Sequence, residues 1–305
     1  MTGVALLGAG RAMADAAGHA PIHIALTFDD NYWAPAYATM RSICMVSPRA
    51  TDIVFHLLHV GLSDRHQADI EAVTTEFGAR IVYYDLDALG ILKQRIAALP
   101  RVGMHINTPI VYARLFLTDI VPSAVERLIF IDSDMMVRAP IEHLADLDLE
   151  GFPLAAASDP YRTGFQTGRD LKPKRYYSTR DLFFNAGLLV IDTRKMAQVD
   201  IVGSILQLLS PDEVAGLYYD QDILNIVFRN NWRVLDKLWN LQNPLPAHEV
   251  LDPFVVHYTG IHKPWLLFKK PAFKRMYRHM MTNAYYYRYL RERLARRFWP
   301  GWLVK

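Results

Sequence analysis

Cysteine is scarce in this sequence: Cys44 is the only one among 305 residues, so no disulfide can form within the chain. This usage fits a reducing compartment. Apolar runs are also short, because none approaches the roughly 20 residues that span a bilayer. Residues 1–20 lack a basic start followed by a long apolar core, so they do not resemble a signal peptide, and we interpret them as an N-terminal extension.

The sequence does contain enough apolar residues for a large core. Hydrophobic residues make up 51% of the chain and charged residues 21%, which is an ordinary globular composition. The net charge of +3 hides an asymmetry. Residues 269–305 carry 11 Lys and Arg and one acid, Glu292, which leaves residues 1–268 at −7. The sequence therefore predicts a basic tail on an acidic body.

Strand-like and helix-like segments alternate along the body. We expect strands over 22–28, 53–60, 80–84, 128–132, 154–158, 183–191, 232–235 and 255–258. We expect helices over 34–47, 63–77, 109–118, 193–209 and 220–228, and a long loop at 160–181. This alternation predicts an α/β fold with a parallel sheet. Asn185-Ala186-Gly187 is expected to break the strand at 183–191.

The most informative stretch runs from Leu128 to Val137, LIFIDSDMMV. Its apolar residues predict a strand buried on both faces, and Asp132 and Asp134 follow at the end where open α/β sheets place their ligands. In an extended chain, side chains two residues apart point to the same side. Because two close carboxylates repel each other, a divalent cation is the natural reason to keep them together. The alternative is a polar turn that ends a strand.

Other polar groups follow expected strands or open an expected helix. They are Asp29-Asp30-Asn31, Asp159 and Asp220-Gln221-Asp222. Each could be a turn or a helix N-cap, but together they line one edge of the expected sheet.

A histidine, a glycine and a lysine come at and after the last expected strand. His257 ends that strand, and Gly260 and Lys263 follow it. Imidazole can complete the coordination of a metal held by carboxylates. Glycine permits close approach to a phosphate, and lysine supplies positive charge to it. A metal, a diphosphate and a cationic side chain are the usual set for binding a nucleoside diphosphate and stabilising it as a leaving group.

Six motifs occur in order along the chain. They are Thr27-Phe28-Asp29-Asp30-Asn31-Tyr32, Tyr112-Ala113-Arg114, Phe130-Ile131-Asp132-Ser133-Asp134, Phe184-Asn185-Ala186-Gly187, Asp220-Gln221-Asp222 and His257-Tyr258-x-Gly260-x-x-Lys263-Pro264-Trp265. In this order they resemble glycosyltransferase family 8, most of all its bacterial lipopolysaccharide galactosyl- and glucosyltransferases, over about residues 22–265.

The resemblance implies a GT-A fold, in which a Rossmann-like, mostly parallel sheet is flanked by helices. It also implies a UDP-galactose or UDP-glucose donor, Mn²⁺ with Mg²⁺ as the alternative, and retention of anomeric configuration. The implied metal ligands are Asp132, Asp134 and His257. The implied donor-binding residues are Thr27, Asp29, Asn31, Arg114, Asp132, Ser133, Asn185, Gly260 and Lys263. The implied catalytic residues are Asp220, Gln221 and Asp222, with Asp159 on the sugar or acceptor side.

Two retaining routes stay open. Retaining glycosidases place a carboxylate nucleophile below the anomeric carbon. The family's matching position is an amide, Gln221 here, with Asp222 beside it. The acceptor can attack from the same face, assisted by the departing diphosphate, or Gln221 or Asp222 can act in a double displacement. We favour the first route, because an amide is a poor nucleophile.

We therefore expect a hexosyltransferase that acts on a saccharide acceptor, such as lipopolysaccharide or another cell-surface glycan. One alternative is a non-catalytic nucleotide-sugar-binding or membrane-surface protein with the same fold. Another is a phosphohydrolase of the haloacid dehalogenase type, which also uses Asp-x-Asp after a strand. That class places the motif on its first strand and has Thr or Val two residues later, whereas Met136 stands here.

The tail at 269–305 interleaves its 11 basic residues with nine aromatic ones. Tyr and Trp suit the headgroup level of a bilayer, and Lys and Arg suit anionic lipid, so we predict binding to an anionic membrane surface. RNA binding and a solvated terminus are the alternatives. We expect three parts, an extension at 1–20, a glycosyltransferase domain at 21–268 and the tail, which we expect to form a helical extension. We expect no nucleic-acid partner and a place in the cytoplasm, at the inner face of a bacterial cytoplasmic membrane.

Overall fold

The computed structural model describes residues 19–90, 95, 109–160, 181–215, 217 and 219–298. The expected N-terminal extension at 1–20 and the expected loop at 160–181 lie almost entirely outside these residues.

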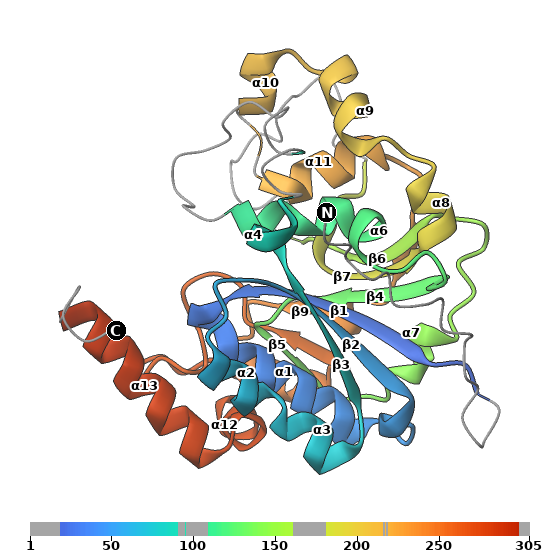
Figure 1. Ribbon diagram of the computed structural model, residues 1–305. Helices are drawn as coiled ribbons and strands as arrows, with labels where there is room; N and C mark the ends of the chain where they lie inside the picture. Colours follow the sequence, from blue (N-terminus) through green and yellow to red (C-terminus); the bar gives the residue numbers. More distant parts are fainter. Residues whose placement is uncertain are drawn as a thin grey trace, which may run out of the picture.

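A seven-stranded sheet forms the centre of the molecule (Figure 1), in the order β3-β2-β1-β4-β7-β6-β8. Its strands are β1 (Ile22–Asp29), β2 (Ile53–Val60), β3 (Arg80–Asp85), β4 (Arg127–Ile131), β6 (Leu154–Ser158), β7 (Phe184–Asp192) and β8 (Arg233–Leu235). β7 runs antiparallel to both of its neighbours, and the other six strands run parallel to one another. The predicted α/β architecture with a mostly parallel sheet is therefore confirmed.

The reversed strand β7 determines what stands at the edge where the parallel strands end. Ile131, the last residue of β4, pairs with Leu188. The first residues of β7, Asn185 to Gly187, therefore extend past the end of β4. The strand continues through these residues, so the expected break was wrong for β7 itself, but the pairing of β7 with β6 shifts register here, between Leu189 and Phe184. The side chain of Asn185 accepts a hydrogen bond from the Gly187 N–H at 3.0 Å, so these residues lie within the strand with their polar atoms paired.

A second, three-stranded sheet in the order β5-β10-β9 was not predicted. Its strands are β5 (Met135–Val137), β9 (Leu241–Gln242) and β10 (Val255–His257). β5 continues the chain directly after Asp134, and β10 pairs with it antiparallel so that His257 lies opposite Met135. This pairing brings the end of β10 next to the end of β4.

Helices cover the two faces of the central sheet and bury two separate hydrophobic cores (Figure 1). One face carries α1 (Trp33–Val46), α2 (Asp64–Ile70), α3 (Ala72–Phe77), α12 (Lys274–Met281) and α13 (Asn283–Phe298). The other carries η3 (Pro109–Phe116), α6 (Leu117–Ile120), α8 (Thr193–Ala197), α9 (Ile201–Leu208), α10 (Pro211–Ala215) and α11 (Tyr219–Val227). Shorter elements are η1 (Asp30–Tyr32), η2 (Ala50–Asp52), α4 (Leu86–Leu89), α7 (Glu142–Ala145), η5 (Lys237–Asn240) and η6 (Pro246–Leu251).

Three expected helices differ from those observed. The segment at 109–118 begins as a 3-10 helix, whose three-residue turn aligns the buried residues Ile110, Ala113 and Phe116 on one face. The helix at 63–77 starts at its Ser63 cap and stops at Gly78, as predicted, but it divides at Glu71. The helix at 193–209 divides before Ile201, because the Asp200 carboxylate accepts a hydrogen bond from the Gly203 N–H and begins a new helix.

The described part of the basic tail packs onto the body. Tyr277 of α12 and Tyr289 of α13 are fully buried in the core that they share with α1. Tyr286 is also buried, whereas the side chain of Tyr287 is 51% exposed. Three further aromatic residues of the tail, Trp299, Trp302 and the side chain of Phe298, lie outside the described residues. None of the described helices combines the length and apolar character that crossing a bilayer requires.

Candidate active site

The two acids of the Asp-x-Asp motif stand in a turn between two strands. β4 ends at Ile131, the chain turns through Asp132 to Asp134, and β5 begins at Met135. The buried Thr39 hydroxyl of α1 lies 2.9 Å from the Ser133 carbonyl and 2.7 Å from the Met135 carbonyl. The predicted convergence of the two carboxylates is confirmed, but a turn anchored by α1 produces it, and not the alternation of an extended strand.

His257 completes a three-residue group with these acids. One ligand atom from each of Asp132, Asp134 and His257 lies within 4.8 Å of the others. His257 Nε2 is 3.2 Å from Asp134 Oδ1 and 3.6 Å from Asp132 Oδ2. Two carboxylates and an imidazole suit a hard or borderline divalent cation such as Mn²⁺. The donor set therefore fits the metal that the motif implies.

Two cationic side chains flank the acids. Arg114 of η3 donates to Asp132 Oδ1 at 2.9 Å and to the Ala186 carbonyl at 2.7 Å, and its Nε lies 2.7 Å from Asp220 Oδ2. Lys263 donates to Asp134 Oδ2 and to the Tyr258 carbonyl. The motif residues Arg114, Asp220 and Lys263 are thus brought to the acids, as expected for one site.

The three carboxyl groups have different proton affinities. Burial raises the pKa of Asp132, and the nearby Asp134 adds to this, although Arg114 opposes both. Burial would also raise the pKa of Asp134, but Lys263 and His257 outweigh it and hold that pKa below its ordinary value. Burial raises the pKa of Asp220 to about 6 against the pull of Arg114. The two acids of one motif therefore differ because Lys263 and His257 outweigh burial at Asp134, whereas burial prevails at Asp132.

A cluster of amides adjoins the metal group. Gln221 of α11 accepts hydrogen bonds from Asn185 Nδ2 at 3.0 Å and from the Ala186 N–H at 3.2 Å, and its Nε2 donates to Asp159 Oδ2 at 3.0 Å. The structure therefore joins Asn185, Gln221 and Asp159. Asp222 is buried beside Asp220 on the same helix.

The residues matched to the nucleoside stand at the end of β1. Asp29 is the last residue of that strand, and its carboxylate accepts a hydrogen bond from the Asn31 N–H at 2.9 Å. The hydroxyl of Ser133 donates to the Thr27 carbonyl at 3.1 Å, which ties this strand end to the turn of the acids. Asp30 points away, because it accepts hydrogen bonds from Ser63.

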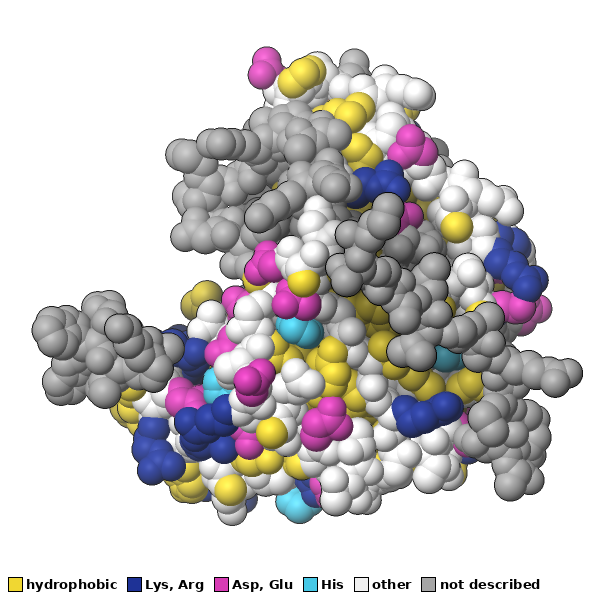
Figure 2. Space-filling model, viewed as in Figure 1, with side chains coloured by type: hydrophobic (Ala, Val, Ile, Leu, Met, Phe, Trp, Pro, Cys, Tyr) yellow, Lys and Arg dark blue, Asp and Glu magenta, His cyan; other side chains and the backbone are white. Residues whose placement is uncertain are grey.

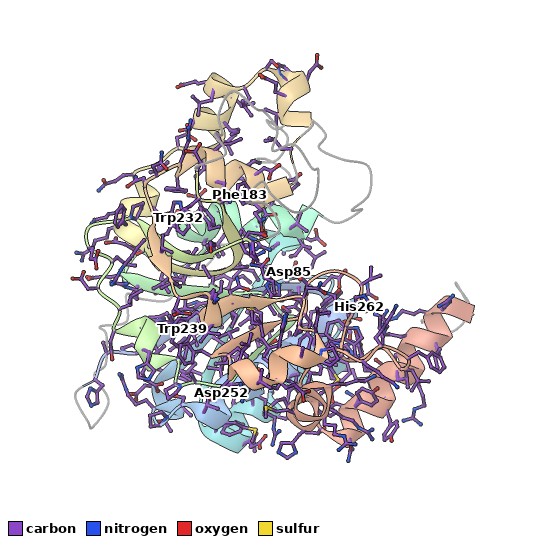
Figure 3. The ribbon with its side chains drawn as sticks, turned by 180° about the vertical axis from the view of Figure 1, so that it is seen from behind. Asp85, Phe183, Trp232, Trp239, Asp252 and His262 are labelled. Carbon is purple, nitrogen blue, oxygen red and sulfur yellow. The ribbon has the colours of Figure 1, made fainter. Side chains whose placement is uncertain are left out.

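Gly260 and Lys263 lie in the loop that follows β10. The exposed residue His262 of the same loop is labelled in Figure 3. Gly260 has a φ of +67°, and no atom of another described residue, its chain neighbours apart, lies within 4 Å of the place where a Cβ would stand, which suits a close approach by a ligand.

One site residue was missed. Asn240, at the end of η5, lies 2.9 Å from His257 Nδ1 through its Oδ1, and it belongs to none of the six motifs. No sequence signal marked it, because a single asparagine between Trp239 and Leu241 has no spacing that points to a ligand.

Comparisons with known proteins identify the family. The profile of "Glycosyl transferase family 8" matches residues 23–268. Glycosyltransferase GlyF from Streptococcus pneumoniae serotype 4 is 29% identical over 255 residues, or 79% of this chain and 56% of GlyF. This chain therefore spans little more than half the length of that relative. Lipopolysaccharide 1,3-galactosyltransferase from Salmonella typhimurium is 26% identical over 260 residues, or 80% of this chain and 72% of that enzyme.

A solved structure supports the same assignment. The crystal structure of galactosyltransferase LgtC with donor and acceptor sugar analogues superposes with a TM-score of 0.71 at 25% identity. The likeness covers 85% of this chain and 95% of that one, and it confirms the predicted GT-A fold. The chain belongs to glycosyltransferase family 8, as the six motifs predicted.

Proposed function

We propose that this protein transfers galactose or glucose from a UDP-sugar to a saccharide acceptor, such as lipopolysaccharide or another cell-surface glycan, with retention of anomeric configuration. The observation that carries the proposal is the convergence of Asp132, Asp134 and His257 within 4.8 Å at the edge of the sheet. The galactosyltransferases among its relatives support the sugar class.

Mn²⁺, with Mg²⁺ as the alternative, would be held by Asp132, Asp134 and His257. A bound divalent cation supplies positive charge that stabilises a departing diphosphate. Around it, Arg114 and Lys263 add two cationic groups on the side of the acids. The donor's nucleoside is assigned to Thr27, Asp29 and Asn31 at the end of β1, beside Ser133. Gly260 and Lys263 are assigned to its diphosphate.

The transferred sugar is assigned to the amides of Asn185 and Gln221 and to Asp220, with Asp159 behind Gln221. The oxygen of Gln221 already accepts two hydrogen bonds, which withdraw electron density from it. This supports the same-face route over attack by Gln221. Asp222 remains the candidate nucleophile of the alternative double displacement.

The test is UDP release by the purified protein with UDP-galactose or UDP-glucose, in Mn²⁺ or in EDTA. We expect slow release that requires the metal and prefers one sugar. Asp132→Asn should abolish it, whereas Asp146→Asn, an exposed acid after α7, should not. Metal-dependent UDP binding without release or transfer would favour the non-catalytic alternative. The absence of both UDP binding and UDP release would overturn the proposal.

We also propose that the protein works in the cytoplasm at the inner face of the cytoplasmic membrane, without a nucleic-acid partner. Because Tyr277, Tyr286 and Tyr289 are buried, we assign lipid contact to other groups. Leu267 and Phe268 are 56% and 89% exposed, directly before Lys269 and Lys270. Figure 2 shows further basic side chains gathered over α12, α13 and the neighbouring α2. Apolar side chains next to basic ones suit the surface of an anionic bilayer.

Flotation with vesicles that contain phosphatidylglycerol tests this assignment. The variant Leu267→Ser/Phe268→Ser should lose most of its flotation at low salt. The control Val250→Ser removes an equally exposed apolar residue, 86% exposed, from η6 and should float like the unaltered protein. Equal flotation of all three proteins would contradict the assignment.

A further inference from the structure

A line of buried side-chain amides leads away from His257. Its Nδ1 lies 2.9 Å from Asn240 Oδ1, and Asn240 Nδ2 donates to Asn185 Oδ1 at 2.9 Å. Asn185 Nδ2 then donates to Gln221 Oε1 at 3.0 Å, and Gln221 Nε2 donates to Asp159. All members except the partly exposed Gln221 are buried. A continuous path of hydrogen bonds therefore joins the metal group to the residues assigned to the transferred sugar.

Backbone groups fix the direction of this path. The Gly187 N–H donates to Asn185 Oδ1 at 3.0 Å, and the Ala186 N–H donates to Gln221 Oε1 at 3.2 Å. A backbone N–H can only donate, so the atom of Asn185 that faces it is the oxygen. Asn240 must then turn its NH₂ group towards Asn185. Its oxygen consequently faces His257.

An oxygen at this place determines which imidazole nitrogen carries the proton. The oxygen of Asn240 accepts from Nδ1–H, so the neutral His257 ring has its lone pair on Nε2. Nε2 is the nitrogen that faces Asp132 and Asp134. In the other tautomer, Nε2 would carry a hydrogen, and it could not bind a cation.

The position of Asn240 is itself held firmly. Asp236 caps η5 by accepting from the Leu238 N–H at 2.8 Å, and the Phe254 N–H donates to the Leu238 carbonyl at 2.9 Å. Trp239, labelled in Figure 3, packs on Phe254 with ring centroids 5.0 Å apart. The backbone that carries Asn240 is therefore anchored beside His257.

We propose that Asn240 is a positioning residue, which holds His257 as the Nδ1–H tautomer and so presents Nε2 to the cation. This inference rests on the proposed function, because it assumes that His257 is a ligand. Outer partners of metal-binding histidines commonly change metal affinity 10- to 100-fold when they are replaced.

The test compares Asn240→Leu, Asn240→Asp and Gln242→Leu. Leucine removes the acceptor at similar volume, and aspartate keeps an acceptor for Nδ1–H. Gln242→Leu is the control for loss of a buried amide: Gln242 lies opposite His257 in the pairing of β9 with β10, but its side chain donates to the Ser158 carbonyl and not to a proposed ligand. The readouts are histidine side-chain ¹⁵N shifts of the metal-free protein, with His257→Gln to assign the signal, and Mn²⁺ binding by electron paramagnetic resonance.

We expect Asn240→Leu to show the Nε2–H tautomer of His257 and to bind Mn²⁺ about 10- to 100-fold more weakly. Asn240→Asp should keep the Nδ1–H tautomer, and Gln242→Leu should match the unaltered protein in both readouts. An Nδ1–H signal and unchanged Mn²⁺ affinity in Asn240→Leu would overturn the inference. So would a changed tautomer with unchanged affinity.

Failure of the proposed function would look different. In that case the unaltered protein itself would bind no Mn²⁺, while the shifts of metal-free His257 would still report whether Asn240 sets its tautomer. If Asn240→Leu does not fold, the tautomer of His257 is compared between Asn240→Asp and the unaltered protein. We expect the Nδ1–H tautomer in both, and an Nε2–H signal in Asn240→Asp would contradict the inference.

Discussion

Gly187 leaves room for the side chains of the metal group, because it has no Cβ. A Cβ built on it would lie 2.5 Å from the His257 ring and 2.6 Å from Asp132 Oδ2. It would also lie 2.9 Å from Asn185 Oδ1. Real Cβ atoms do not approach other atoms so closely. Glycine is therefore required here for close packing between side chains, and not for an unusual backbone conformation.

Gly187→Ala should weaken Mn²⁺ binding about 10- to 100-fold, because the methyl group displaces two of the proposed ligands. The measurement is a Mn²⁺ titration followed by paramagnetic resonance. Gly203→Ala serves as the control, since its Cβ would also crowd a carboxylate, Asp200, but in α9 and away from the site. Equal affinity of Gly187→Ala and the control would show that the ligands can move aside.

Lys263 competes with a cation for Asp134. Its ammonium group contacts Asp134 Oδ2, one of the carboxylate oxygens of the metal group. Lys263→Met should therefore raise the affinity for Mn²⁺ in the absence of donor. It should lower the affinity for UDP in the presence of Mn²⁺, because the charge assigned to the diphosphate is lost. Calorimetry with each ligand measures both, and Lys269→Met, in the same loop, is the control. A parallel rise or a parallel fall of both affinities would argue against this dual role.

At the scale of single elements, helix α13 forms hydrogen bonds to the turn that contains Asn31. The hydroxyl of Tyr289 donates to the Asn31 carbonyl at 2.9 Å, and Arg296 donates to Asn31 Oδ1 at 2.6 Å. The indole of Trp33 donates to Glu292 at 3.1 Å. The tail that was predicted to bind a membrane surface therefore also supports the nucleoside side of the proposed donor site.

Tyr289→Phe should lower the free energy of unfolding by about 1 kcal/mol, because the Asn31 carbonyl loses its donor. It should also raise the Kd for UDP several-fold, since the turn is held less firmly. Tyr287→Phe is the matched control: its exposed hydroxyl bonds to Arg278 on the same surface and reaches no part of the site. Denaturant unfolding and calorimetry give the two values. Equal UDP affinity in the two variants would separate α13 from donor binding.

Most strands of the central sheet, and the polar residues that follow them, could be predicted from the sequence. Apolar runs such as IVFHLLHV and RLIFI are too short for a typical helix and are rich in β-branched and aromatic residues, which favours a buried strand. The direction of β7 could not, because nothing local distinguishes a parallel from an antiparallel buried strand. In the small sheet, β10 was expected as the strand at 255–258, but β5 and β9 were missed, because two or three residues alone give no clear periodic pattern.

At the scale of the whole molecule, a pair of histidines in the central sheet makes the stability of the folded chain depend on pH. His23 and His56 lie 2.9 Å apart, and Tyr84 lies 2.9 Å from the other nitrogen of His56. Burial, with the charge of Arg80, lowers the pKa of His23 to about 4, and burial, with His23, lowers that of His56 to about 3. Both rings are therefore neutral in the folded chain at pH 6.

The folded chain then binds fewer protons than the unfolded chain as pH falls below about 6.5, so stability is lost between about pH 6.5 and pH 4. Thermal unfolding should show Tm falling over this range in the unaltered protein. The double variant His23→Gln/His56→Gln should lose less Tm over the same range, because it lacks the two imidazoles that take up protons on unfolding. An equal fall in both proteins would assign the acid sensitivity to other groups.

The candidate site was predictable where chemistry repeats in a recognisable spacing, as for Asp132, Asp134 and His257. It was not predictable where a residue acts through another residue. Asn240 and Gly187 illustrate the difference: the glycine stood in a motif without a stated role, and the asparagine stood in none. The tail shows the same limit at larger scale, because composition reports charge and aromatic content but not which tyrosines the core will bury.

The late position of β7 in the chain also sets the order in which the sheet can be completed on the ribosome. β1 to β4 can pair once residue 131 has emerged, but β4 then keeps a bare edge until Phe184–Asp192 follows, because its second neighbour comes later in the chain. An unpaired buried strand is a hazard for aggregation during synthesis. His257 emerges later still, so the nascent chain holds the two acids without their imidazole until β10 has been made.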